Sequence, residues 1–189
     1  MKLKEVMQLL QRDSLTPWHI EVIPRPPSDI LKAHLQRLQA FDLKSSEQAK
    51  TLLIDALFAE IVPLHPKLKI WKAATLSTDI MTGIADYLMA PHRAYLGTPL
   101  MCVVEAKRDD FEQGTAQCIA EMVACQWNNQ QENVVIDVFG IVSNGQGWQF
   151  YKLTKEGEIF ETDLLAMSDL PELLGTLDYL CTESDKNIP

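Results

Sequence analysis

Residues 99–108 read Pro-Leu-Met-Cys-Val-Val-Glu-Ala-Lys-Arg, and five consecutive apolar residues follow Pro99. Such a run predicts a strand buried on both faces of a sheet. The run ends in Glu105-Ala106-Lys107. Because side chains alternate along a strand, Glu105 and Lys107 share one face, about 7 Å apart. Two charges at the end of a buried strand are costly to desolvate unless they are paired or used, so this end is either an ordinary solvated strand end or part of a functional site.

The composition limits the class of protein. The chain has 189 residues, of which 47% are hydrophobic and 23% charged, which suffices for one full core. No apolar run approaches the ~18 residues of a membrane span, and the N-terminus does not resemble a signal peptide. We therefore expect a cytoplasmic protein with no membrane partner. The formal net charge of −9 argues against tight autonomous binding to duplex nucleic acid, because that affinity comes largely from neutralising phosphates.

Cysteine and histidine give no sign of a zinc site or a disulfide framework. The four cysteines include no CxxC pair, and Cys102, Cys118 and Cys125 lie inside apolar segments, which predicts buried thiols. The four histidines are scattered, without HxH or HxxxH spacing. Zinc is therefore not expected.

The first 43 residues form a predicted N-terminal extension that packs on the core. Helical spacing predicts a helix over residues 2–11, alternation predicts a strand over 18–23, and three prolines in 24–27 mark a linker. Ser28 is a good N-cap for a second helix that runs to about residue 43.

Residues 44–189 form the predicted main domain. Ser45 or Ser46 can cap a helix that ends near Val62. The remaining elements are predicted from apolar periodicity and turn residues, with an Asn-Gly hairpin turn over 143–147. They are strands over 67–75, 83–89 and 100–107, a helix over 111–129, strands over 134–142 and 148–153, an edge strand over 159–161 and a last helix over 170–181.

Asp86 lies in the middle of the second of these strands, where an unpaired carboxylate is costly. It is either a structural ion-pair partner or a functional residue. If the strands around residues 86 and 105 are hairpin neighbours, Asp86 and Glu105 lie side by side on one face. Two adjacent carboxylates repel each other, which raises at least one pKa unless a cation lies between them. Lys107 could neutralise one carboxylate, and a divalent metal ion would account for the pair better.

These features together resemble a known superfamily. The sequence Gly83-Ile84-Ala85-Asp86, then Val103-Val104-Glu105-Ala106-Lys107, then a helix that carries Gln117, resembles the PD-(D/E)XK nucleases over about residues 44–153. Asn144-Gly145 followed by Trp148-Gln149-Phe150-Tyr151 resembles the hairpin of the type I restriction-like branch. Ala85 stands where the motif name has proline, a position that varies. The resemblance implies an α/β (mixed α+β) fold with a restriction endonuclease-like αβββαβ core, whose central mixed sheet is flanked by helices.

The resemblance also implies roles for individual residues. Asp86 and Glu105 would be carboxylate ligands of Mg²⁺ or Mn²⁺, with the Ala106 backbone carbonyl as a further ligand, and Lys107 would orient or deprotonate the attacking water. Glu47 matches the acidic residue often found on the first core helix, as a catalytic and metal-binding group. The alternative for that place is Glu60. Gln117 resembles the glutamine that supports the site from the second helix, for which Gln113 is a weaker candidate.

The function implied is metal-dependent hydrolysis of phosphodiester bonds, in DNA rather than RNA, of the restriction or repair type. The acidic charge balance suggests that a second copy of the chain or a protein partner supplies targeting. The alternative is a catalytically silent binding or regulatory module that keeps the fold and acts with a protein partner. A small-molecule enzyme of the parallel α/β type has no support, because GxGxxG, GxxxxGK and GxSxG motifs are absent from the sequence.

Overall fold

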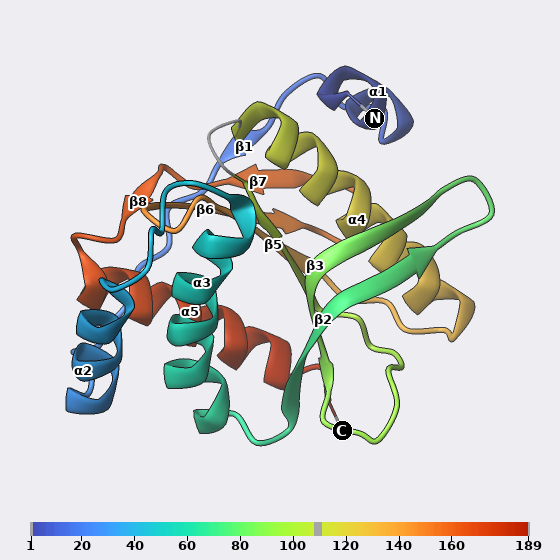
Figure 1. The fold of residues 1–189 in the computed structure, drawn as a ribbon. Helices are drawn as coiled ribbons and strands as arrows, with labels where there is room; N and C mark the ends of the chain where they lie inside the picture. The colour runs from blue at the N-terminus through green and yellow to red at the C-terminus, as the bar shows by residue number, and fades with distance from the viewer. Residues whose placement is uncertain (1, 108–110, 189) are drawn as a thin grey trace.

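The residues around Val104 form the central strand of a mixed sheet in the computed structural model, which describes residues 2–107 and 111–188 (Figure 1). The elements of the described residues follow in chain order. They are α1 (Leu3–Leu9), β1 (Thr16–Pro17), α2 (Asp29–Leu38), α3 (Glu47–Ile61), the 3-10 turn η1 (Val62–Leu64), β2 (Leu68–Ser77), β3 (Thr82–Pro91), β4 (Cys102–Ala106), α4 (Phe111–Gln131), β5 (Val138–Ser143), β6 (Gly147–Leu153), β7 (Ile159–Glu161), β8 (Leu165–Ala166) and α5 (Leu170–Asp185).

Eight strands pair into one sheet with the order β1-β7-β6-β5-β4-β3-β2, and β8 pairs with β6. β4 runs antiparallel to β3 and parallel to β5, so the sheet is mixed. The parallel step requires a crossover, and α4 provides it between β4 and β5. β2, β3 and β4 form an antiparallel meander, so the strands that carry Asp86 and Glu105 are neighbours. The predicted mixed α/β class with a helix-flanked mixed sheet is confirmed.

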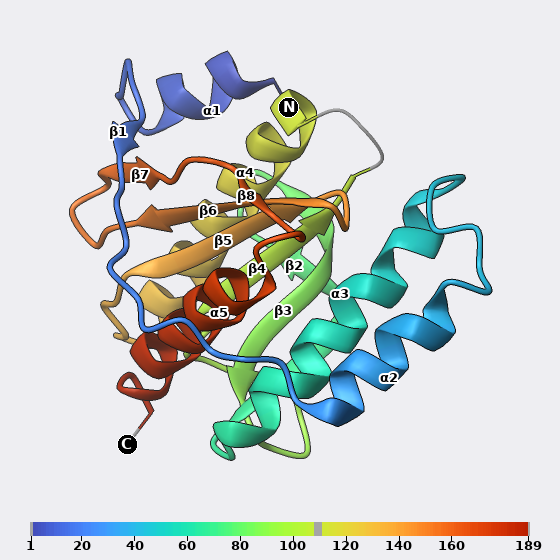
Figure 2. The same cartoon turned by 90° about the vertical axis from the view of Figure 1, so that its left-hand side faces the viewer.

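Helices cover both faces of the sheet (Figure 2). α3 and α5 lie on one face, with α2 packed on α3, and α4 lies on the other face, with α1 packed on α4. Successive side chains of β4 point alternately toward these two layers of helices. Cys102, Val104 and Ala106 join the core beneath α3 and α5, whereas Val103 joins the core beneath α4. Glu105 and Lys107 share the parity of Val103 and therefore belong to the α4 side.

The C-terminal half of α4 anchors the start of β4. Asn129 is 1% exposed, and its Oδ1 accepts a hydrogen bond from the Leu100 amide at 2.7 Å. Its Nδ2 donates to the Leu100 carbonyl at 2.8 Å. One side chain thus supplies both hydrogen bonds that a neighbouring strand would supply. Farther along the sheet, an added Cβ on Gly140 would lie 2.5 Å from both Cys118 Sγ and Met122 Sδ, so α4 approaches β5 closely.

The strand predicted over residues 18–23 is wrong. Only Thr16 and Pro17 pair with another strand, as β1 alongside β7. The Trp18 amide still donates to the Glu161 carbonyl of β7 at 2.7 Å, but residues 19–23 pair with no strand. Trp18 stacks on Phe139, and the chain then crosses α5, so the apolar alternation reflects packing on the core. The crossing is close, since an added Cβ on Gly175 would lie 2.6 Å from the Ile23 carbonyl oxygen. β7 is therefore not an edge strand as predicted, and β8 was not foreseen.

The four cysteines are buried and form no disulfide, as expected for the three that lie in apolar segments. Within residues 2–107 and 111–188, no helix is both long and apolar enough to cross a membrane.

Candidate active site

Asp86 and Glu105 lie directly opposite each other at the point where β3 and β4 separate. Tyr87 pairs with Val104 in the antiparallel register, which places position 86 across from position 105. The Ala106 amide donates to Asp86 Oδ2 at 2.8 Å, and the Asp86 amide lies 3.5 Å from Glu105 Oε1. Glu105 is completely buried, and Asp86 is partly buried. The two predicted carboxylates are therefore neighbours on the α4 side of the sheet.

Lys107 and Gln117 adjoin this pair. Lys107 Nζ lies 3.2 Å from Glu105 Oε2 and donates a hydrogen bond to Gln117 Oε1 at 2.9 Å. Gln117 comes from α4, so the helix fixes the position of the ammonium group. The Lys107 stem runs along Gly114 of the same helix, where an added Cβ would lie 2.8 Å from Lys107 Cγ. A glycine at position 114 therefore leaves the space that the lysine occupies.

Glu121 completes the group, and it was not predicted as a site residue. It is 5% exposed, its Oε1 accepts a hydrogen bond from Gln117 Nε2 at 3.2 Å, and its carboxyl is hydrogen-bonded to that of Glu105. Its spacing four residues after Gln117 was visible in the sequence, but spacing alone did not show that this turn of the helix faces Glu105. We call Asp86, Glu105, Lys107, Gln117 and Glu121 the Glu105 cluster.

Burial dominates the electrostatics of the Glu105 cluster. Desolvation raises the pKa of Glu121 well above its ordinary value, and the hydrogen bond with Glu105 raises it further. Desolvation also raises the pKa of Glu105, against the lowering effects of its Glu121 hydrogen bond and of Lys107. The Lys107 ammonium contacts Glu105 Oε2 at 3.2 Å, whereas Glu121 Oε2 accepts no hydrogen bond from the described residues. Either a proton held between the two carboxyl groups or a bound cation can satisfy the Glu121 oxygen.

Replacing Glu121 with Gln is expected to stabilise the metal-free protein at pH 8. A carboxyl whose pKa is higher in the folded than in the unfolded state costs stability, because the unfolded chain releases the proton at lower pH. This loss of folding free energy grows as the pH rises above about 4.5, the pKa of a glutamate in the unfolded chain, and persists through neutral pH. Gln keeps hydrogen-bonding capacity but has no proton to lose. Melting temperatures in EDTA should therefore differ at pH 8 and converge near pH 5, and an equal difference at both pH values would contradict this account.

The residues of the Glu105 cluster fit a hard divalent cation. Mg²⁺ takes oxygen ligands, and one or two protein carboxylates suffice when water and phosphate oxygens complete its shell. Asp86 and Glu105 supply two adjacent carboxylates, and Lys107 is the cation that contacts Glu105 Oε2 among the described residues. Those residues contain no group of three or more His, Cys, Asp or Glu side chains placed to hold a metal ion. A site of this kind would therefore depend on the substrate and water for its remaining ligands.

The other predicted residues lie outside the Glu105 cluster. Glu47 is exposed in the first turn of α3, on the opposite face of the sheet, and no hydrogen bond or ion pair among the described residues joins it to the cluster. α3 nevertheless begins at the same end of the sheet, because Gly145 of the β5–β6 turn approaches Leu53. Glu60 accepts hydrogen bonds from the Ser28 amide and hydroxyl, both at 2.8 Å, and so serves the N-terminus of α2. The Ala106 carbonyl remains a predicted ligand.

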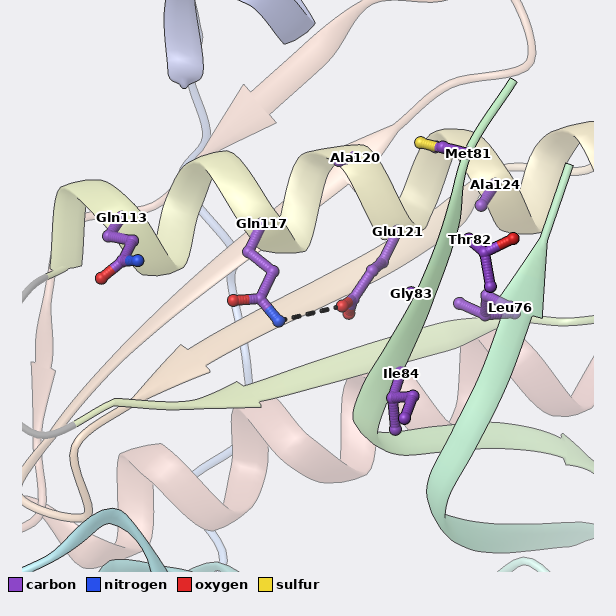
Figure 3. A pocket seen from close by; sticks show the side chains of 10 residues that line it. All are labelled: Leu76, Met81, Thr82, Gly83, Ile84, Gln113, Gln117, Ala120, Glu121 and Ala124. Atoms are coloured by element: carbon purple, nitrogen blue, oxygen red, sulfur yellow. Dashed lines mark hydrogen bonds between the residues drawn. The ribbon is translucent and has the colours of Figure 1, made fainter. Parts of the chain in front are cut away.

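A cavity of about 390 Å³ adjoins the Glu105 cluster between the β2–β3 hairpin and α4 (Figure 3). Gln113, Gln117 and Glu121 succeed one another along its α4 side, and Gly83 and Ile84 lie across from them on β3. Gln113, the weaker sequence candidate, is exposed here, one turn before Gln117. The cavity and the cluster are thus contiguous through two shared side chains.

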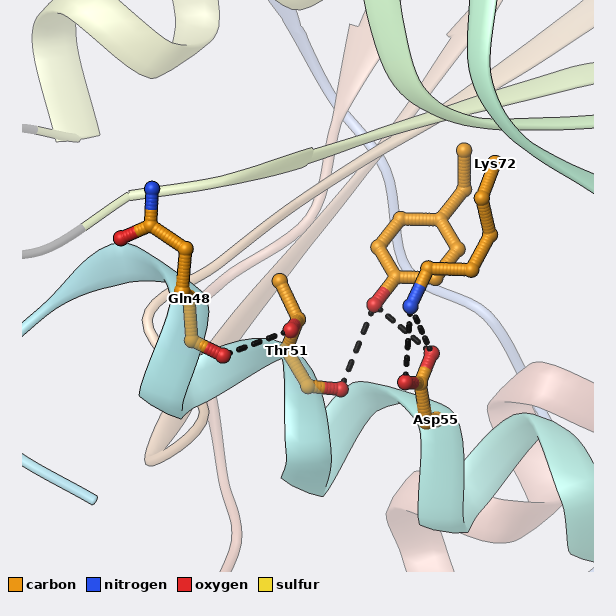
Figure 4. Close-up of polar contacts among 5 residues, drawn as sticks. Gln48, Thr51, Asp55 and Lys72 are labelled. Carbon is orange, nitrogen blue, oxygen red and sulfur yellow. Dashed lines mark hydrogen bonds and ion pairs between the residues drawn. The ribbon is translucent and has the colours of Figure 1, made fainter. Parts of the chain in front are cut away.

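A second polar group joins α3 to the β2–β3 hairpin on the α3 side of the sheet (Figure 4). The buried Tyr87 hydroxyl lies 2.9 Å from Asp55 Oδ1 and 3.2 Å from the Thr51 carbonyl oxygen, and Lys72 pairs with Asp55 at 2.8 Å. Desolvation, with the Asp55 hydrogen bond, raises the pKa of Tyr87 far above its ordinary value. Asp55 therefore holds α3 against β3 next to the catalytic candidate Asp86.

Compared with known proteins, the chain matches no protein-family model, and no curated protein matches its sequence. Function is therefore inferred from the chemistry of the Glu105 cluster and from its place in the fold.

Proposed function

We propose that this protein is a metal-dependent nuclease that hydrolyses phosphodiester bonds, with DNA as the preferred substrate. The observation that carries the proposal is the buried Glu105, directly opposite Asp86 and in contact with Lys107 at the end of β4. The element order α3-β2-β3-β4-α4-β5-β6 supports it, because the PD-(D/E)XK resemblance implies a helix, three strands, a helix and a hairpin in that order. Fold alone does not determine a reaction, so the residues of the site carry the argument.

Each residue of the Glu105 cluster has a role in this proposal. Mg²⁺ or Mn²⁺ would be held by Asp86, Glu105 and the Ala106 carbonyl, with Glu47 as a predicted additional ligand. When bound, such an ion polarises the phosphoryl group and lowers the pKa of coordinated water.

The chain's own groups position and stabilise the reacting atoms. Lys107 Nζ orients the attacking water and offsets negative charge that develops on the phosphoryl oxygens. Gln117 Oε1 holds this ammonium in place, while Gln117 Nε2 holds Glu121. Glu121, with its raised pKa, keeps a proton that Glu105 can accept as a hydrogen bond, which limits repulsion among the carboxyl groups before the metal ion binds.

The test is cleavage of a mixed panel of supercoiled plasmid, linear duplex, single-stranded DNA and structured RNA, each in Mg²⁺, Mn²⁺ and EDTA. Wild type is compared with Lys107→Ala. The expected result is cleavage that requires both the metal ion and Lys107, with the panel giving the substrate class. If wild type cleaves no substrate and calorimetry detects no metal binding, the nuclease proposal is wrong, and a non-catalytic binding module remains.

Gly114→Ala is expected to lower nuclease activity while the protein stays folded. The added methyl group would lie 2.7 Å from Val142 Cγ1 and 2.8 Å from Lys107 Cγ, so the flexible lysine must move. A displacement of about 1 Å at a catalytic group can cost on the order of 100-fold in rate. Single-turnover cleavage measures the effect, and Gly97→Ala is the matched control, because its methyl group would meet the exposed ring of Tyr95. Equal rates for the two variants would contradict the assigned position of Lys107.

We also propose that targeting comes from a second copy of the chain or from a protein partner, since a net charge of −9 disfavours autonomous duplex binding. Light scattering tests the homodimer form of this proposal. A monomer mass at high protein concentration would exclude it and leave a different protein as the partner.

A further inference from the structure

The cavity beside the Glu105 cluster has two apolar walls. Leu76, Met81 and Ile84 contribute from the β2–β3 hairpin, and Ala120 and Ala124 contribute from α4 (Figure 3). The helix side is lined by small residues, and Gly83 on the hairpin side leaves more room, because an added Cβ there would meet nothing within 4 Å. An open space between apolar walls suits a planar group with two apolar faces.

The end of the cavity next to the Glu105 cluster is polar. The Gln117 amide and the Glu121 carboxyl line it, and Glu121 is buried with one oxygen that accepts no hydrogen bond from the described residues. A ligand with hydrogen-bonding groups along its edge would meet these side chains while its faces contact the apolar walls. A nucleobase has that combination of apolar faces and polar edge.

We propose that this cavity receives one unpaired nucleobase of the substrate strand, adjacent to the phosphate that is cleaved. The inference rests on the proposed nuclease function and specifies its substrate: a strand that presents an unstacked base, as single strands, flaps and mismatches do. The contiguity of cavity and cluster supports it, because Gln117 and Glu121 belong to both. A perfectly paired duplex would have to extrude the base at a cost in free energy.

The first experiment uses a labelled single-stranded oligonucleotide that carries one abasic site, with cleavage products resolved at single-nucleotide resolution. The bond at one fixed offset from the abasic site should be cut roughly tenfold less than in the intact strand, because the apolar walls no longer bury the faces of a base. Moving the abasic site should move the protected bond by the same number of nucleotides. A cleavage pattern that is the same with and without the abasic site would overturn the proposal.

Two substitutions fill the cavity from opposite walls, Gly83→Val from the hairpin and Ala120→Leu from α4. Both should bind Mn²⁺ like wild type but cut the intact strand roughly tenfold more slowly, and both should lose the protected bond at the abasic site. Ala59→Leu is the control for the second substitution, because it makes the same change at an exposed position of α3. Wild-type rates for both cavity variants would overturn the proposal.

A binding measurement separates failure of this proposal from failure of the nuclease function. An oligonucleotide that contains 2-aminopurine is titrated with protein in Ca²⁺, and its fluorescence reports unstacking of the base. Wild type should increase the fluorescence and bind tighter than Gly83→Val, whether or not any strand is cleaved in Mg²⁺. If this binding is observed but no strand is cleaved, the nuclease function is contradicted and the base-binding proposal stands. If the fluorescence is unchanged and the two proteins bind with equal affinity, the base-binding proposal is contradicted.

Discussion

Glu105→Gln is expected to lower metal-dependent cleavage by on the order of 100-fold or more, and yet to leave the metal-free protein at least as stable as wild type. The loss follows because Glu105 is one of two adjacent carboxylates available to a divalent cation. The unchanged or higher stability follows because Glu105 is fully buried, and desolvation together with Asp86 raises its pKa. Removing a buried charge that faces other carboxyl groups relieves a cost. Cleavage rates and melting temperatures in EDTA measure the two effects.

Opposite effects on activity and stability distinguish a functional carboxylate from a structural one. Glu132→Gln, the same change at an exposed position just after α4, should alter neither quantity. Addition of Mg²⁺ should raise the melting temperature of wild type and of Glu132→Gln, because a ligand that binds only the folded state stabilises it. It should have little effect on Glu105→Gln. Cleavage by Glu105→Gln at the wild-type rate would contradict the proposed role of Glu105 as a metal ligand.

Asn129→Leu is expected to destabilise the protein by about 2–6 kcal/mol, the cost of leaving two buried backbone groups unpaired at about 1–3 kcal/mol each. Asn129 bonds both the amide and the carbonyl of Leu100, at 2.7 and 2.8 Å. Leu has a similar size but neither donates nor accepts. The melting temperature should fall by roughly 2–4 °C for each kcal/mol, which thermal unfolding measures directly.

Gln130→Leu is the control for this substitution, because it makes a closely similar change at the exposed neighbouring position. It should shift the melting temperature little. Since Leu100 lies just before β4, which carries Glu105, the folded fraction of Asn129→Leu should retain the cleavage rate of wild type at a temperature below its transition. Equal stability of the two leucine variants would show that the Leu100 backbone finds other partners.

Most elements of the core could be predicted from local sequence. The periodicity of apolar residues indicated α3 to β6 within a few residues of their bounds, and turn chemistry indicated the β5–β6 hairpin. The proximity of Asp86 and Glu105 followed from the hypothesis that their strands are hairpin neighbours and from alternation along each strand. The domain boundary near residue 43, Glu47 as a ligand and the chemistry itself stay predictions.

Three features could not be predicted, because each depends on contacts between distant segments. Glu121 is buried against Glu105 since α4 crosses directly over β4 and β5, and helical spacing does not say which turn lies over which strand. The apolar residues after Pro17 pack on Phe139 and α5 without strand pairing. Asp55 accepts a hydrogen bond from Tyr87 and pairs with Lys72, both from the sheet, and helical spacing does not show that this side of α3 faces them.

The sequence by itself determined the helices and strands of the core, the buried character of β4 and the shared face of Glu105 and Lys107. These are local properties, set by apolar periodicity and by the alternation of side chains along an extended chain. Only the tertiary structure decided that Glu121 completes the group around Glu105 and that a cavity opens next to Gln117 and Glu121. Those features depend on the placement of α4 and the β2–β3 hairpin over the sheet, which is set by packing between residues far apart in the chain.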